Sequence, residues 1–286
     1  MAAEPGRRRA AVIGHPVAHS RSPAMHTAAY RALGLDWDYS RIDVEPAGLA
    51  AFVAGLDAGG FAGVNVTIPH KAAVLELCDE VSDEARRAGS VNTVLVRSGR
   101  LRGETTDGHG LLWALGEVEP ADALVLGAGG AARAAVTALA DAGWQVAVSA
   151  RRPEAAAELG VGVEPWPPRT GARLVVNATP IGQREAGTVP AQAGTVPIAV
   201  GRPEAGTVPI PVELITPEMV VCDLAYRGDG SPTPLVEAAA ARGARAVDGL
   251  DVLVGQGIAA FELFTGVPAP VDVMRAAAWG RTPPDR

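Results

Sequence analysis

The amino-acid sequence predicts an α/β protein with two domains, and three observations support this prediction. The chain has 286 residues, of which 48% are hydrophobic and 20% are charged, so it can bury a sizeable core. Apolar, β-branched runs alternate with helical patterns, and such alternation is typical of a mostly parallel sheet. A glycine-rich turn at residues 127–130 lies between an apolar run and an alanine-rich helix, and it begins a second set of alternating elements.

The first half of the chain is expected to form a β-α-β-α-β run that ends in a hairpin. Pro23 suits the first turn of a helix that stops at Gly34, and Gly89 ends the helix that follows Ser82. The hairpin begins with a strand at 90–96 and turns at Ser98-Gly99. The elements before it are, in order, strand 9–13, helix 23–33, strand 37–44, helix 48–56, strand 61–68, helix 72–77 and helix 82–87.

The second half repeats the alternation and then becomes helical. Its expected elements are strand 123–126, a helix ending at Gly143, strands 145–149, 174–177 and 219–224, and helices 234–242, 256–264 and 271–279. Since no strand follows Gly249, we expect the C-terminal helices to pack back on the first domain. The pentapeptide Ala-Gly-Thr-Val-Pro begins at Ala186, Ala193 and Ala205, which predicts a low-complexity surface insertion at about 184–211.

Charge and cysteine usage exclude several classes of protein. The formal net charge is −7, and no basic run extends beyond Arg7–Arg9, so nucleic acid and anionic membranes are not expected partners. The apolar run that follows is four residues long, too short for a signal core or a membrane span. Cys78 and Cys222 fit neither a disulfide framework nor a metal motif, which favours a reducing cytoplasm.

Lys71 is the only lysine beside 24 arginines. A desolvated ammonium can exchange its proton near neutral pH, whereas a guanidinium stays charged. Lys71 also lies at an expected strand-to-helix junction, together with Asn65 and Thr67, and the carboxyl ends of strands are where open α/β sheets bind ligands. It is therefore a candidate for proton transfer. The alternative is a lysine that remains on a solvated helix face by chance.

A second polar loop follows the first strand and contains Ser20 and Ser22. Ser22, just before Pro23, suits a helix N-cap, and Ser20 has no expected capping role. Two hydroxyls that flank one residue can also hold a polyol, and both interpretations stay open. The three histidines of this region lack the spacing of a metal-binding helix, so no metal site is expected: His15, His19 and His26.

The glycine-rich turn indicates a dinucleotide-binding site. Gly127 permits the tight turn, Gly129 lets the backbone approach a pyrophosphate, and Ala132 allows close helix packing. An acidic residue should end the next strand if the cofactor were NAD. That strand is instead followed by Arg151 and Arg152, whose guanidinium groups can bind a 2′-phosphate, so NADP is the expected cofactor.

Together these stretches resemble the shikimate dehydrogenase (shikimate/quinate dehydrogenase) family over nearly the whole chain. The matching motifs are His19–Pro23, Asn65–Lys71, Gly89–Thr93, Gly127–Ala132, Asn177–Gly182, Asp223–Tyr226 with Thr233–Leu235, and Gly249 with Gln256-Gly257. The resemblance implies NADP-dependent, reversible reduction of 3-dehydroshikimate to shikimate, for aromatic (chorismate) biosynthesis, by a monomer or a homodimer. It implies a substrate-binding and catalytic domain at 1–107, completed by 249–286, and an NADP-binding Rossmann domain at 108–248.

The resemblance also implies roles for individual residues. Lys71 and Asp107 would be the catalytic pair. The substrate would be surrounded by Ser20, Ser22, Thr67, Lys71, Asn92, Asp107, Tyr226 and Gln256. NADP would be held by Gly127, Ala128, Gly129, Gly130, Ala131, Ala150, Arg151, Arg152, Thr179, Leu224 and Gly249.

The chain departs from the family pattern at Thr105, Ala150 and Gln183, where asparagine, asparagine and methionine are usual. Thr105 bears on how Asp107 is held, and Gln183 bears on the wall near the nicotinamide. A paralogue that acts on quinate or aminoshikimate would share every motif. A non-catalytic NADP-binding sensor is the alternative from another class, and the presence of both Lys71 and Asp107 argues against it.

Overall fold

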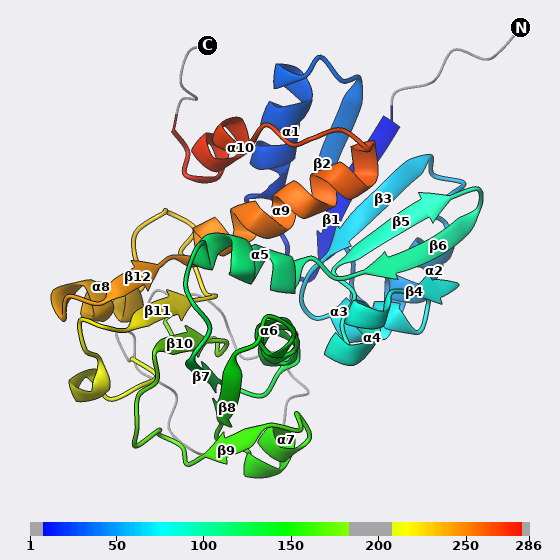
Figure 1. Cartoon of the computed structure of the whole chain (residues 1–286). Coiled ribbons are helices and arrows are strands. Elements are labelled where there is room, and N and C mark those ends of the chain that lie inside the picture. Colours follow the sequence, from blue (N-terminus) through cyan, green and yellow to red (C-terminus); the bar gives the residue numbers. More distant parts are fainter. Residues whose placement is uncertain (1–7, 183–207, 282–286) are drawn as a thin grey trace, which may run out of the picture. The chain divides into compact units, whose positions relative to one another are not determined.

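The structure, a computed structural model, describes residues 8–182 and 208–281 and confirms the α/β fold, with two six-stranded sheets (Figure 1). The chain divides into two compact units. The first comprises Met1–Pro120, Gly130–Trp144 and Leu250–Arg286, and the second comprises Ala121–Gly129 and Gln145–Gly249. The domain limits of 1–107 with 249–286 and of 108–248 stay a prediction. Of the expected insertion at 184–211, residues 184–207 lie outside the described residues, as does Gln183.

The first sheet combines parallel and antiparallel strands. Its strands lie in the order β2 (Trp37–Asp43), β1 (Arg8–Gly14), β3 (Phe61–Val66), β5 (Thr93–Arg97), β6 (Arg100–Glu104) and β4 (Glu80–Val81). Strand β1 runs parallel to both β2 and β3, and the β5–β6 hairpin continues the sheet antiparallel to β3. Because β2 and β3 leave β1 on opposite sides, the carboxyl ends of β1 and β3 form the switch point at which such sheets bind ligands.

Both faces of this sheet are buried. Ala10 and Val12 of β1 belong to one apolar cluster, and Ala11 and Ile13 belong to another, as the two-residue period of a strand requires. The helices of the first unit are α1 (Ser22–Ala32), α2 (Leu49–Ala54), α3 (Lys71–Leu75), α4 (Asp83–Ala88), α5 (Asp107–Leu115), α6 (Gly130–Asp141), α9 (Gly249–Thr265, all but its first residue) and α10 (Val271–Ala278), with a 3₁₀ turn, η1 (Pro46–Gly48).

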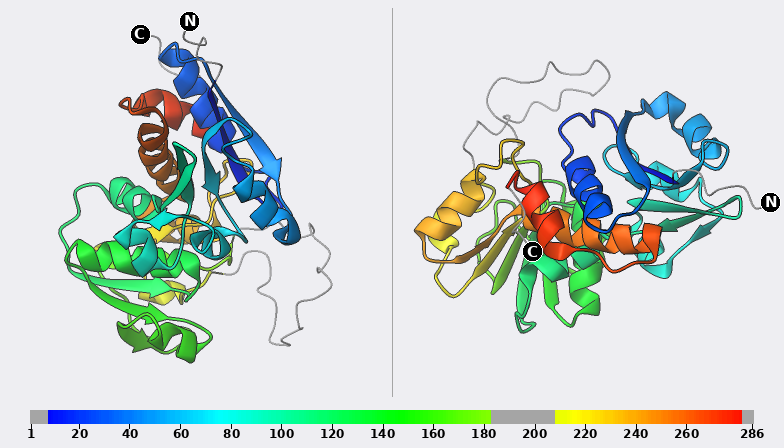
Figure 2. Two further views of the ribbon diagram at one scale, coloured as in Figure 1. Left: turned by 90° about the vertical axis from the view of Figure 1, so that its right-hand side faces the viewer. Right: turned by 90° about the horizontal axis from the view of Figure 1, so that it is seen from above.

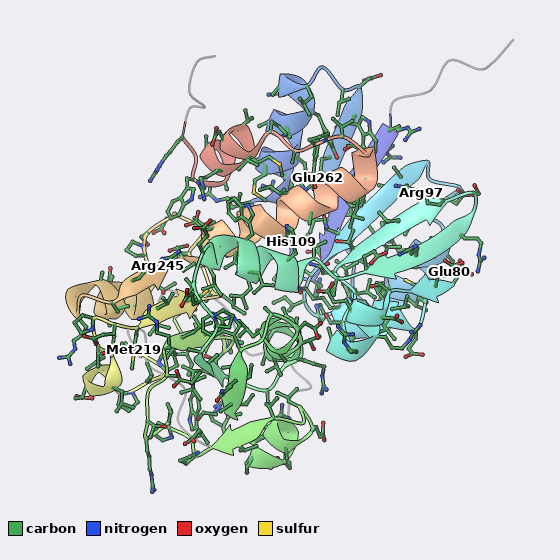
Figure 3. All side chains as sticks on the ribbon, in the orientation of Figure 1. Glu80, Arg97, His109, Met219, Arg245 and Glu262 are labelled. Carbon is green, nitrogen blue, oxygen red and sulfur yellow. The ribbon has the colours of Figure 1, made fainter. Side chains whose placement is uncertain are left out.

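The C-terminal helices pack back on the first unit, as the sequence predicts. Phe261 and Phe264 of α9 and Met274 of α10 share an apolar cluster with α1, β1 and β2. Figure 2 shows the red and orange C-terminal helices beside the blue α1 in both views. Full burial of each phenylalanine contributes about 1.5–3 kcal/mol to stability. Arg97, labelled in Figure 3, adds a hydrogen bond of 2.7 Å from its Nη2 to the carbonyl of Leu263.

The second sheet has six parallel strands. Their order is β12 (Arg245–Val247), β11 (Val220–Asp223), β10 (Leu174–Asn177), β7 (Asp122–Leu126), β8 (Gln145–Ser149) and β9 (Gly162–Glu164). This is the order of a dinucleotide-binding sheet, whose switch point lies between β7 and β10. Helices α7 (Pro153–Ala157) and α8 (Pro234–Ala241) and a 3₁₀ turn, η2 (Val212–Leu214), complete the unit. Its core is formed by Leu124, Leu126, Val175, Val221 and Leu235 with their neighbours.

Two local expectations were incomplete or wrong. Sequence patterns did not predict α5, because Gly108 and Gly110 lower the helical propensity of its first turns. The prediction that Ser22 is an N-cap was wrong, since Arg21 occupies that position and caps through no side chain. Among the described helices, none is both long enough and apolar enough to cross a membrane.

Candidate active site

Lys71 and Asp107 form a direct, partly buried ion pair. Lys71 is the first residue of α3, just beyond the carboxyl end of β3, and Asp107 is the first residue of α5. The Lys71 Nζ donates to Asp107 Oδ2 over 2.6 Å, and the two side chains are 25% and 22% exposed. A hydrogen bond between two charged groups is short and strong, so the carboxylate fixes the direction of the ammonium. The remaining N–H bonds of Lys71 are available to a ligand oxygen.

Asn92 holds the second oxygen of Asp107. It lies just before β5, and its Nδ2 donates to Asp107 Oδ1 over 2.7 Å. Its Oδ1 accepts from the backbone N–H of Thr106 over 2.8 Å. The neighbouring Val91 N–H donates to the carbonyl of Lys71 over 2.9 Å. The structure therefore joins three of the expected site residues, Lys71, Asn92 and Asp107, through hydrogen bonds.

The serine loop, residues 15–22, follows the carboxyl end of β1. Ser20 and Ser22 are both buried, and the Ser22 N–H donates to Ser20 Oγ over 3.3 Å. Ser20, which had no expected capping role, thus accepts the first free amide of α1. The guanidinium of Arg41 donates twice to the Ser20 carbonyl, over 3.0 and 2.8 Å. Burial raises the pKa of Tyr39 of β2, and the nearby Ser22 side chain opposes that shift.

Thr67 and Gln256 also belong to the first unit. Thr67 follows β3, and its N–H donates to the Ile13 carbonyl over 2.9 Å, which places it at the switch point of the sheet. Gln256 lies on α9, where its Nε2 donates to the Leu253 carbonyl over 2.8 Å. Helix α9 crosses α5 here, since a Cβ on Gly110 would lie 2.7 Å from the Gln256 nitrogen. Tyr226 follows β11 in the second unit.

The glycine turn of the second unit fits a bound pyrophosphate. Gly127 has φ +110°, which side-chain-bearing residues rarely adopt, and a Cβ there would lie 3.1 Å from the Ala178 carbonyl and 3.2 Å from the Thr179 methyl. In contrast, a Cβ on Gly129 or Gly130 would meet no atom within 4 Å. The turn therefore packs tightly on the side of β10 and is open on the other, where a phosphate can approach the backbone.

Asn177, at the end of β10, holds Thr179. Its Oδ1 accepts from the Thr179 N–H and hydroxyl over 3.0 and 2.7 Å, and its carbonyl accepts from Leu224 N–H over 3.0 Å. Its Nδ2 donates to Asp223 Oδ1 over 2.8 Å.

Asp223, at the end of β11, is fully buried and also accepts from the Ala225 N–H and the Thr233 hydroxyl. Burial raises the pKa of Asp223 to about 6, although its hydrogen-bond donors oppose the shift. Gly249 approaches the same turn, because a Cβ on it would lie 2.4 Å from the Ala225 carbonyl. The hydrogen-bonding roles of Asn177 and Asp223 were not predicted from the sequence. The available signal was a polar residue at the end of each buried parallel strand.

Arg151 and Arg152 are exposed just after β8, and Ala150 beside them is buried. Arg152 immediately precedes α7, which begins at Pro153. Two exposed guanidinium groups at this strand end fit the 2′-phosphate of NADP better than a ribose hydroxyl. Within residues 8–182 and 208–281, no three or more His, Cys, Asp or Glu side chains gather where they could hold a metal ion.

Comparisons with known proteins agree with this geometry. Residues 12–94 match the shikimate dehydrogenase substrate binding domain, and residues 249–278 match the shikimate 5'-dehydrogenase C-terminal domain. The chain is 43% identical over 279 residues to shikimate dehydrogenase (NADP(+)) from Acidiphilium cryptum (strain JF-5), and the match covers 93% of each chain.

Solved structures give the same result. Shikimate 5-dehydrogenase from Thermus thermophilus, in complex with NADP(H) and shikimate, has a TM-score of 0.82 and 40% identity, with 94% of this chain and 98% of that chain covered. The ligand-free 5-ketofructose reductase of Gluconobacter sp. strain CHM43 has a TM-score of 0.79 and 30% identity, with 95% and 98% covered. The chain therefore belongs to the shikimate dehydrogenase family.

Proposed function

We propose that this protein is an NADP-dependent shikimate dehydrogenase that reversibly reduces 3-dehydroshikimate to shikimate in the shikimate pathway. The observation that carries this proposal is the ion pair of 2.6 Å between Lys71 and Asp107, in which Lys71 lies just beyond the carboxyl end of β3 in the parallel part of the first sheet. The named relatives support it, because the curated relative from Acidiphilium cryptum is a shikimate dehydrogenase (NADP(+)). The Thermus thermophilus structure contains both NADP(H) and shikimate.

Lys71 and Asp107 are the proposed catalytic residues. NADPH, when bound, supplies the hydride that reduces the ketone. Lys71 Nζ gives a proton to the substrate oxygen as that oxygen gains negative charge, and in the reverse direction it takes the proton back. Asp107 accepts one N–H of Lys71, which leaves the others directed at the substrate. Asn92 keeps the carboxylate in place from its other oxygen.

The remaining expected residues are proposed to bind the two ligands. Ser20, Ser22, Thr67, Asn92, Tyr226 and Gln256 are proposed to bind shikimate, together with the catalytic pair. The proposed NADP-binding set is Gly127–Ala131, Ala150–Arg152, Thr179, Leu224 and Gly249. Support for this set comes from the open backbone at Gly129 and Gly130 and from the Asn177–Asp223 hydrogen bonds that hold Thr179. We also propose a cytoplasmic location, and a monomeric or homodimeric state.

A related dehydrogenase of another cyclic polyol is the second candidate. The similarity to 5-ketofructose reductase favours it, because that protein reaches nearly the same TM-score as the shikimate dehydrogenase. The absorbance of NADPH separates the candidates: its appearance is followed with NADP and shikimate, quinate or aminoshikimate, and its loss is followed with NADPH and 5-ketofructose. We expect the highest kcat/KM with shikimate and NADP. A higher kcat/KM with another substrate reassigns the enzyme, and binding of NADP and shikimate without turnover indicates a sensor.

A further inference from the structure

A line of buried polar side chains leads from β2 to Asp107. Tyr39 Oη donates to Asn65 Oδ1 over 2.6 Å, and Asn65 Nδ2 donates to Thr93 Oγ1 over 3.0 Å. Thr93 Oγ1 donates to Asn92 Oδ1 over 3.0 Å, and Asn92 Nδ2 donates to Asp107. The first four of these residues are at most 5% exposed. We call this line the Tyr39–Asp107 chain.

Backbone groups fix the direction of the Tyr39–Asp107 chain. The carbonyl of Asn92 can only accept, so the Asn65 group that faces it at 3.4 Å is the NH₂. The N–H of Thr106 can only donate, so the Asn92 atom that faces it is Oδ1. Every side-chain donor between Tyr39 and Asp107 therefore points toward the carboxylate. Hydrogen bonds aligned in one direction polarise and strengthen one another.

The Tyr39 end of the Tyr39–Asp107 chain is held in place by its surroundings. The Tyr39 ring is fixed by a parallel stack on the buried His26, with centroids 4.2 Å apart and planes 9° apart. A single line of hydrogen bonds thus connects a fixed, buried tyrosine with the proposed catalytic carboxylate.

We propose that Tyr39 and Thr93 are positioning residues, which keep the Asn92 amide donating to Asp107. This inference rests on the proposed function. Rotation of the Asn92 amide by half a turn would place its oxygen against the Asp107 carboxylate, where two acceptors repel. The hydroxyl of Thr93 opposes that rotation, because it donates to the Asn92 oxygen in the present orientation.

Thr93→Val tests the middle of the chain, because it removes only the hydroxyl and keeps the shape. We expect kcat for shikimate oxidation to fall about three- to tenfold, which corresponds to the loss of one or two neutral hydrogen bonds. The Kd for NADP should stay unchanged, and Thr93→Ser should restore most of kcat. Thr105→Val is the matched control. Although Thr105 departs from the asparagine that the family usually has near Asp107, its hydroxyl is buried without a hydrogen-bond partner in the described part of the chain. It therefore makes no hydrogen bond to Asp107, and its loss should change kcat less than about twofold.

A double-mutant cycle tests whether Tyr39 and Thr93 act through the same hydrogen bonds. Tyr39→Phe and Thr93→Val interrupt the same chain, so the double variant should lose much less kcat than the product of the two single losses. The proposal is overturned if the two losses of kcat multiply in the double variant. It is also overturned if Thr93→Val folds and keeps kcat within twofold of wild type. Wild-type protein that does not oxidise shikimate rejects the proposed function instead. In that case the same cycle is measured by urea unfolding of the single and double variants. Changes in the unfolding midpoint that add up overturn the coupling, and a double variant with less than the sum of the two changes supports it.

Discussion

Gly110→Ala is expected to disturb the active site through the crossing of α5 and α9. A Cβ on Gly110 would lie 2.6 Å from the Val252 carbonyl oxygen, 2.7 Å from the Gln256 nitrogen and 2.9 Å from the Gln256 Cβ. Two of these are backbone atoms of α9, so no side-chain rotation relieves the overlap. The helices have to separate by about half an ångström, and overpacking of this kind costs about 1–3 kcal/mol of stability.

The same displacement should reach the chemistry. Asp107 lies one turn before Gly110 on α5, and its carboxylate is 2.6 Å from Lys71 Nζ. Small errors in the position of catalytic groups are costly, so kcat should fall roughly tenfold. Urea unfolding and steady-state kinetics measure the two effects. Gly48→Ala is the control, because a Cβ on Gly48 meets no atom within 4 Å. If Gly110→Ala has the stability and the kcat of the wild type, the close contact between α5 and α9 does not position Asp107.

Three further predictions concern the second unit. Arg152→Ala should raise KM for NADP about tenfold to hundredfold and leave kcat/KM with NAD nearly unchanged. A wild-type enzyme with equal kcat/KM for NADP and NAD contradicts this prediction. The pKa of Asp223 is raised from 3.8 to about 6, so the folded protein binds this proton more tightly than the unfolded chain. The contribution of Asp223 to the free energy of unfolding therefore declines by up to about 3 kcal/mol as pH rises from 4 to 6. Urea unfolding measured across this pH range should show that decline for the wild type and not for Asp223→Asn. The same pH dependence in both proteins contradicts the prediction. Deletion of residues 186–207 should leave kcat within about twofold of wild type, since loop length changes closure entropy slowly, and a folded but inactive deletion contradicts this.

The main strands and helices were predictable because their signals are local. The β1 run Ala10–Ile13 is apolar at every position, as expected for a strand buried on both faces, and the predicted helix 256–264 lies within α9. Strands β4, β9 and β12 were missed because two or three residues carry no detectable period. They exist because neighbouring strands offer unpaired backbone groups, which is a tertiary effect.

The Lys71–Asp107 pair shows what the sequence can and cannot supply. Composition singled out Lys71, because one lysine remained among 24 arginines. Asp107 and Asn92 carried no comparable signal by themselves, since each also suits a turn, and only the resemblance to a family grouped them with Lys71. Tyr39, Asn65 and Thr93 escaped notice as a connected set. Their partners lie on different strands, so the hydrogen bonds that join them depend on the register of the sheet.

Reductive methylation of Lys71, the only lysine in the sequence, tests whether this side chain exchanges the proton with the substrate. Dimethylation keeps the charge but leaves one N–H, so Lys71 cannot donate to Asp107 and to the substrate oxygen at the same time. Mass spectrometry gives the modified fraction, and shikimate with NADP should protect Lys71. We expect the rate of NADP-linked shikimate oxidation to fall in proportion to that fraction, while NADP still binds. Undiminished turnover by protein whose Lys71 is fully dimethylated would contradict it.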